Sequence, residues 1–226
     1  MSNSLEDKLK EKRLKELEGQ LESARMLSPD EIAFQIQELG FECLRCGECC
    51  TGTDNSVVLF PLEIRQILEQ TGESWLESVE PPITGEWDDQ GNFHTLEWRI
   101  KKLSGSCRYY HARECLCRIY GERPILCSTY PFYIEEGLLR CSECRGLGRK
   151  IDNTRAMEMA NQLIDRYITE IEEAISLVRM FKDFPRGGPS KKGSCVVHDS
   201  EGEHHLTWTK GLLRRCLHAD QCNKHP

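Results

Sequence analysis

The chain has 226 residues, and its 37 acidic and 30 basic side chains leave a formal charge of −7. This length suits one domain with appendages, since domains usually have about 100–200 residues. The acidic balance excludes a general nucleic-acid-binding protein, which would need a basic face to neutralise phosphates.

The first forty residues predict two helices. Residues 4–26 are rich in lysine and glutamate, and they carry an apolar stripe at a/d spacing formed by Leu14, Leu17, Leu21 and Ala24. The same register places Asp7 and Lys10 on the stripe, so it is too short for a coiled coil, and we expect a solvated helix rather than a partner-binding one. Residues 28–39 predict a second helix, because a serine can cap its start and a glycine follows its end.

Four cysteines then fall within eight residues, at Cys43, Cys46, Cys49 and Cys50. A Cys-x2-Cys pair suits one metal, because two intervening residues let both sulfurs turn toward a point about 2.3 Å away. The repeated spacing also matches the first three ligands of a bacterial-type iron–sulfur sequence. Cys50 departs from that sequence, because it follows Cys49 directly, whereas the iron–sulfur sequence has three intervening residues and then Cys-Pro. Since adjacent side chains diverge, we expect Cys49 and Cys50 to serve different metals.

The 13 cysteines could instead form disulfides, which persist outside the reducing cytosol. However, the N-terminus has no apolar h-region, and no stretch approaches the roughly 18 apolar residues of a membrane span. An odd number of cysteines would leave one thiol unpaired in an oxidised protein, and disulfide scaffolds are typically under about 80 residues long. We therefore expect a cytoplasmic, thiol-rich protein with no membrane and no nucleic acid among its partners.

A short buried strand is predicted at residues 57–60, a helix at 61–70, and a loop or hairpin at 80–97. A second group of thiols follows, at Cys107, Cys115, Cys117, Cys127, Cys141 and Cys144. Residues 117–132 of this group read Cys-x-Ile-Tyr-x2-Arg-Pro-x2-Cys-x2-Tyr-Pro-Phe.

Together these motifs resemble the zinc- or iron-chelating domain of the YkgJ-type CxxCxxCC cysteine-cluster proteins, over about residues 41–148. Flagellin lysine methylases carry a similar domain. The resemblance implies eight metal ligands, which are Cys43, Cys46, Cys49, Cys50, Cys107, Cys117, Cys127 and Cys144. Cys115 and Cys141 lie beside positions at which the family has cysteines. Three alternatives are open for each of them: a substitute for a family ligand, an extra ligand or an ordinary thiol.

Residues other than cysteine have expected roles around such a site. Four thiolates around Zn²⁺ carry a net charge of about −2, which Arg123, Arg45 or Arg108 could neutralise. A surface arginine is the alternative, most of all for Arg45. Prolines on both sides of Cys127 restrict the backbone of its loop. The aromatic side chains expected to shield the cluster from water are Tyr120, Tyr130 and Phe132.

Residues 153–181 predict one long amphipathic helix, because apolar residues recur there with a period of about 3.6 residues. A hairpin is predicted at residues 195–206. The tail holds three Cys/His pairs, Cys195-x2-His198, Cys216-x-His218 and Cys222-x2-His225. They suggest a second metal site, and the alternative is a reduced thiol tail with scattered histidines.

We therefore expect an α+β fold, with a mostly helical single domain, small β elements and a cysteine-rich metal-binding centre. The predicted organisation is N-terminal helices over 1–40, the chelating domain over 41–148, and a long helix with a Cys/His tail over 149–226. The favoured function is a metal-binding protein that holds zinc or an iron–sulfur cluster, for electron transfer, for holding metal or for scaffolding a protein partner. The alternative is an S-adenosylmethionine-dependent protein lysine methyltransferase, although the sequence has no Gly-x-Gly-x-x-Gly loop and no catalytic pair can be named.

Overall fold

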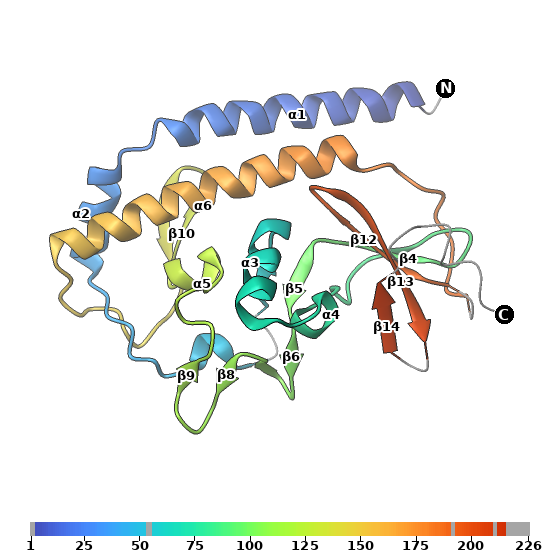
Figure 1. Cartoon of the computed structure of the whole chain (residues 1–226). Helices are drawn as coiled ribbons and strands as arrows, with labels where there is room; N and C mark the ends of the chain where they lie inside the picture. Colours follow the sequence, from blue (N-terminus) through green and yellow to red (C-terminus); the bar gives the residue numbers. More distant parts are fainter. Residues whose placement is uncertain (1–2, 53–55, 191–192, 210–211, 216–226) are drawn as a thin grey trace. The chain divides into compact units, whose positions relative to one another are not determined.

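The computed structural model describes residues 3–52, 56–190, 193–209 and 212–215 (Figure 1). The chain divides into two compact units, the first formed by Met1–Thr51 and Tyr109–Ile175, the second by Gly52–Arg108 and Ser176–Pro226. Helices account for 41% and strands for 23% of the structure. The predicted α+β class is therefore confirmed, whereas a mostly helical fold is not.

The first unit is built mainly from helices. They are α1 (Asn3–Arg25), α2 (Pro29–Leu39), the 3-10 turn η1 (Glu48–Cys50), α5 (Ile125–Thr129) and most of α6 (Asn153–Met180). Two antiparallel hairpins complete it, β8 (Tyr110–His111) with β9 (Leu116–Cys117), and β10 (Phe132–Glu135) with β11 (Leu138–Cys141). Apolar side chains of α2, β10 and α6 form its core, among them Ile36, Phe132 and Leu163.

The two predicted N-terminal helices are both present, and the second has the expected start. The Ser28 side chain accepts a hydrogen bond from the Glu31 backbone N–H at 3.3 Å. Gly40 follows the helix with φ +65, and its N–H donates to the Ile36 carbonyl at 2.8 Å. Gly40 thus closes α2 with a positive φ, although its ψ of 139 lies outside the left-handed helical region.

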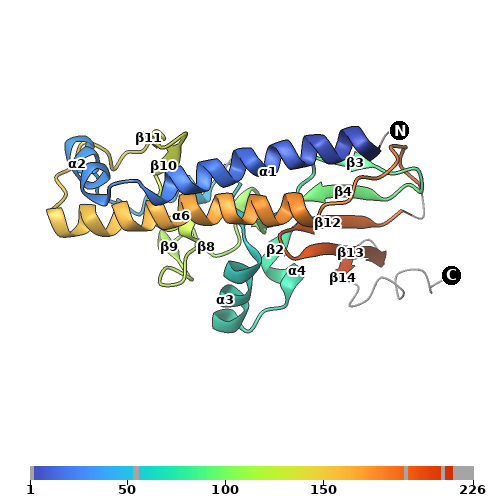
Figure 2. The same ribbon diagram turned by 90° about the horizontal axis from the view of Figure 1, so that it is seen from above.

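Helix α1 lies beside α6 in two perpendicular views (Figures 1 and 2). An ion pair of 2.9 Å joins Arg25 of α1 to Glu172 of α6. Leu17 and Ala24 of the predicted apolar stripe are only 3% and 1% exposed. The prediction of a solvated helix is therefore wrong for this part of α1, which covers apolar surface of its own unit.

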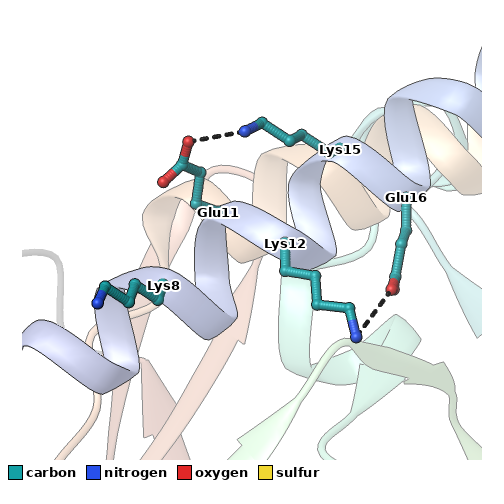
Figure 3. Close-up of a pocket in the computed structure, with 5 residues that line it drawn as sticks. All are labelled: Lys8, Glu11, Lys12, Lys15 and Glu16. Atoms are coloured by element: carbon teal, nitrogen blue, oxygen red, sulfur yellow. Dashed lines mark hydrogen bonds and ion pairs between the residues drawn. The ribbon is translucent and has the colours of Figure 1, made fainter.

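The N-terminal half of α1 has the expected polar surface. Lys15 donates to Glu11 at 2.9 Å, and Lys12 lies 3.8 Å from Glu16, each pair spaced by four residues (Figure 3). Such pairs stabilise a helix by about 0.2–0.5 kcal/mol each. No helix in the described part of the chain is long and apolar enough to cross a membrane.

The second unit contains a five-stranded sheet in the order β14-β13-β12-β4-β3. Its strands are β3 (Glu86–Trp87), β4 (Phe93–Leu96), β12 (Cys195–Asp199), β13 (Gly202–Thr209) and β14 (Leu212–Arg215). Strands β12 and β13 form the predicted hairpin. For residues 80–97, where a loop or a hairpin was predicted, the structure has a hairpin, in which β3 pairs with β4. Strand β4 also pairs with β12 in parallel, which brings Phe93 opposite Cys195.

The other elements of the second unit are a three-stranded sheet in the order β1-β5-β2, a two-stranded hairpin of β6 and β7, and two helices. The elements are β1 (Val58–Leu59), α3 (Pro61–Thr71), α4 (Trp75–Ser78), β2 (Val79–Glu80), β5 (Trp98–Ile100), β6 (Lys102–Leu103) and β7 (Ser106–Cys107). Helix α3 ends at Gly72, which has the left-handed conformation that suits a helix C-terminus. Trp98 is fully buried, and its indole N–H donates to Asp199 at 2.9 Å.

Candidate metal centre

The cysteine loop starts from a segment that is fixed to the chain near Cys144. The Phe41 ring packs edge-on against Phe132, with 5.7 Å between centroids. The Glu42 N–H donates to the Gly146 carbonyl at 3.0 Å. A Cβ at Gly146 would overlap the backbone carbonyl oxygen of Glu42, so only glycine allows this approach. The loop and the Cys144 segment are therefore held side by side.

The turn inside the loop depends on Gly47. This residue has φ +78, and a Cβ built on it would lie 2.0 Å from the Tyr110 hydroxyl oxygen. The Gly47 carbonyl accepts a hydrogen bond from Cys50 at 2.9 Å, which closes the turn of η1. Tyr110 was not predicted as part of the site, and only the glycine within the cysteine motif hints at a close neighbour.

Cys49 and Cys50 do not diverge as predicted, because their sulfurs are 3.9 Å apart. The turn at η1 rotates the two adjacent side chains toward each other. Two sulfurs bound 2.3 Å from one tetrahedral metal lie about 3.8 Å apart, so this pair has the spacing of ligands that share an ion. A hydrogen bond with Cys50 lowers the pKa of Cys49 to about 7, and Arg123 adds to the effect, although burial opposes it.

Two further predicted ligands lie near this pair. Burial raises the pKa of Cys144, and the charges of Cys46, Cys49 and Cys43 raise it further. The Cys144 sulfur also accepts a hydrogen bond from the Gly146 N–H at 3.4 Å.

Cys117, on β9, is the second of these neighbours. Burial raises the pKa of its thiol and the nearby Cys49 adds to this, while Arg123 lowers it. Six of the eight predicted ligands thus interact with one another within the first unit, namely Cys43, Cys46, Cys49, Cys50, Cys117 and Cys144.

The remaining two predicted ligands have different positions. Cys127 is half-buried in α5 of the first unit, where its N–H donates to the Pro124 carbonyl at 2.8 Å. Cys107 belongs to the second unit, where it pairs with Lys102 between β7 and β6. The two thiols without an assigned role, Cys115 and Cys141, are exposed, and the Cys115 thiol donates to the Ala112 carbonyl at 3.7 Å.

Arg123 is placed as predicted, whereas Arg108 is not. The Arg123 guanidinium lies 3.7 Å from the centre of the Tyr120 ring, and Arg45 lies over the same ring at 5.1 Å. Arg123 acts on the thiols of Cys49 and Cys117, as described above. Arg108 instead forms an ion pair of 2.6 Å with Glu73 in the second unit.

Only part of the expected aromatic shield is found. Burial raises the pKa of Tyr130, and the charges of nearby thiols, Cys144 first among them, raise it further. The Tyr130 hydroxyl donates to the Glu143 carbonyl at 2.8 Å. Tyr120 is 41% exposed, so it covers the arginines more than it excludes water. Phe132 is buried in the apolar core.

A carboxylate that the sequence reasoning missed lies within the loop. The Cys46 thiol donates to Glu48 at 3.8 Å, and Glu48 forms an ion pair of 2.6 Å with Arg145. The sequence feature that could have identified Glu48 is its position between two cysteines of the motif.

The donor set has the chemistry that zinc or iron–sulfur binding needs. None of the 11 cysteines in the described ranges is part of a disulfide. Within those ranges, no three His, Cys, Asp or Glu side chains are yet arranged to hold one ion. The sulfurs of Cys49 and Cys50, 3.9 Å apart, have the spacing of ligands that share one ion.

The tail pair Cys195-x2-His198 is unsuited to a shared metal. Side chains three apart on a strand point to opposite faces of the sheet, and both residues lie on β12. Burial raises the pKa of Cys195 to about 11, which disfavours the thiolate that a metal requires. The other pairs, at Cys216 with His218 and Cys222 with His225, lie outside the described residues.

Residues 42–145 match the family model CxxCxxCC, described as "Putative zinc- or iron-chelating domain". This match confirms the resemblance that the cysteine motifs indicate, and it spans all eight predicted ligands. No solved structure matches the chain.

Proposed function

Because residues 42–145 match the CxxCxxCC family model, we propose that this protein binds a metal through cysteine thiolates, either as zinc or as an iron–sulfur cluster. The observation that carries the proposal is the gathering of cysteine thiols around the pair Cys49 and Cys50, whose sulfurs are 3.9 Å apart. The candidate ligands in the first unit are Cys43, Cys46, Cys49, Cys50, Cys117, Cys127 and Cys144. The eighth candidate from the resemblance, Cys107, belongs to the second unit.

The second layer of the site supports thiolate chemistry. Arg123 lowers the pKa of both Cys49 and Cys117, and thereby favours the deprotonated form that binds metal. The exposure of Cys43, Cys46 and Cys49 leaves an open route for an ion or an assembled cluster to enter. Free thiols of this kind suit a reducing compartment, and we place the protein in the cytoplasm.

The bound group would decide the role of the protein. An iron–sulfur cluster would supply electron transfer, whereas zinc would supply structural stability without redox activity. A zinc form would leave scaffolding of a protein partner as the role that fits.

Elemental analysis of anaerobically purified protein tests the proposal. We expect at least one equivalent of zinc or iron per chain. An iron–sulfur form would also absorb visible light and bleach reversibly on reduction, which zinc cannot do. A folded, metal-free protein with its cysteines paired as disulfides would contradict the proposal.

The methyltransferase alternative stays a prediction from the resemblance to flagellin lysine methylases, and no observation in the described residues favours it. Isothermal titration with S-adenosylmethionine distinguishes it from a metal-binding role. We expect no tight binding, and micromolar affinity that is lost on replacement of the cluster cysteines would favour the enzyme.

A further inference from the structure

The second unit places two histidines on one face of its five-stranded sheet. Strands β4 and β12 are parallel, with His94 opposite Val196 and Leu96 opposite His198 (Figure 1). Since alternate residues share a face, His94 and His198 point to the same side. The Phe184 ring stacks on His94 with 3.8 Å between centroids.

Asp88 and the two histidines form a continuous hydrogen-bonded chain. Asp88 Oδ2 lies 3.1 Å from His94 Nε2, and His94 Nδ1 lies 2.8 Å from His198 Nε2. Burial raises the pKa of Asp88, but hydrogen bonds from Asn92 and His94 outweigh it and lower the value to about 2. Asp88 is therefore a carboxylate at neutral pH and can only accept hydrogen bonds.

The ionised carboxylate fixes the direction of every hydrogen bond in the chain. His94 must donate to Asp88 from Nε2, which leaves its Nδ1 as an acceptor in the neutral ring. His198 must then donate from Nε2, and its Nδ1 becomes a bare acceptor. The order is carboxylate, His94, His198, with an unused lone pair at the far end.

That far end has no partner within the described residues. His198 is 2% exposed, and its Nδ1 is buried without a hydrogen bond. Burial and the charge of His94 lower the pKa of His198, and His205 adds to this, while Glu203 and Asp199 oppose it. A buried acceptor without a donor is unfavourable, so a ligand that donates to it would gain affinity.

A cleft of about 410 Å³ lies at this face of the sheet, within the size range of small-molecule sites. Its lining includes His94, His198, Phe181, Phe184 and Arg99. Within the described residues, the Arg99 side chain has no hydrogen bond or ion pair. The cleft therefore combines the His198 imidazole, two flat apolar rings and a cation. Two carboxylates, Glu86 and Glu97, also line it, and that of Glu86 is held by Arg186 at 2.6 Å.

We propose that this cleft binds a small planar molecule with a weakly acidic O–H group, such as a phenol, and that His198 accepts its proton. The O–H bond of the ligand breaks and an N–H bond forms at Nδ1 of His198. The Nε2 proton of His198 passes to Nδ1 of His94, which becomes an imidazolium beside the Asp88 carboxylate. The negative oxygen of the ligand is balanced by Arg99, and no electron is transferred.

Titration of the full-length protein with 4-nitrophenol tests the proposal, because only the phenolate form of this probe absorbs visible light. At a mildly acidic pH, where the free probe is mostly neutral, we expect saturable binding with a rise in phenolate absorbance. Arg99→Gln should weaken binding about tenfold. Arg65→Gln, a matched change at the Arg65–Glu201 ion pair outside the cleft lining, should leave it unchanged. Absence of saturable binding to the folded protein would overturn the proposal.

Asp88→Asn tests the direction of the relay. Asparagine keeps an oxygen for the Gln90 and Asn92 backbone N–H groups but places an amide donor toward His94. It also loses the 2.8 Å hydrogen bond that the Asn92 side-chain amide donates to Asp88 Oδ2. Every hydrogen bond should then reverse, so that His198 Nδ1 carries a proton and the probe no longer ionises.

Nitrogen-15 NMR measures which imidazole nitrogens carry a proton. In the wild-type protein we expect an unprotonated Nδ1 at His198. A protonated Nδ1 there, or equal phenolate absorbance in the wild type and a folded Asp88→Asn variant, would refute the relay.

Discussion

At Gly47, two constraints coincide, a positive φ of +78 and a backbone in contact with Tyr110. Gly148 shares only the first, since it has φ +75 and nothing within 4 Å of an added Cβ. Gly47→Ala should therefore cost the backbone strain of about 1–3 kcal/mol plus the displacement of the tyrosine, whereas Gly148→Ala should cost the strain alone. Denaturant unfolding of the two variants measures the difference. Equal losses would show that the contact with Tyr110 contributes nothing.

The carboxylate of Asp88 should make stability depend on acid pH. Its folded pKa of about 2 lies below the unfolded value of 3.8, so its contribution is complete above pH 3.8 and is lost as the pH falls through 2. The shift corresponds to roughly 2 kcal/mol. Unfolding free energies measured between about pH 5 and 2 should fall less in Asp88→Asn than in the wild type. Parallel curves would contradict the assigned ionisation.

Helix α1 provides a matched pair of leucines at the scale of a single element. Leu17 is 3% exposed and Leu9 is 59% exposed, on the same helix. Leu17→Ala should destabilise the first unit by about 2–4 kcal/mol, because it removes buried apolar volume. Leu9→Ala should change stability by less than about 0.5 kcal/mol. Thermal unfolding compares them, and similar melting temperatures would mean that α1 does not pack as described.

Elements with local signals were predictable from the sequence. The serine cap of α2, the glycine after α3 and the period of α6 each act within a few residues, so these helices were placed correctly. The parallel pairing of β4 with β12 joins distant segments, and no local pattern carries it. The relay from Asp88 through His94 to His198 depends on that pairing and was missed for the same reason.

For the candidate metal site, the sequence indicated which thiols are candidate donors but not how they are arranged. Regular spacing identified the thiols, because ligand loops for metals follow short repeats. The 3.9 Å approach of Cys49 to Cys50 depends on the turn at Gly47, and it contradicted the expected divergence. The placement of Cys107 in the second unit depends on tertiary structure, which a contiguous motif does not reveal.

At the scale of the whole molecule, the central claim is that thiolates of the cysteine cluster hold a metal that stabilises the protein. Structural zinc contributes roughly 10–16 kcal/mol of apparent binding energy in small domains. The loss of one ligand should therefore lower the stability of the protein and not only change the loop. Cys222, in the tail outside the described residues, offers a control thiol.

The most direct test is the metal content of Cys46→Ser, Cys127→Ser and Cys222→Ser, measured per chain after anaerobic purification, together with their melting temperatures. We predict that the first two variants lose metal and melt at lower temperature, while Cys222→Ser keeps the wild-type content and stability. Equal metal content and equal melting temperatures in all three would contradict the account.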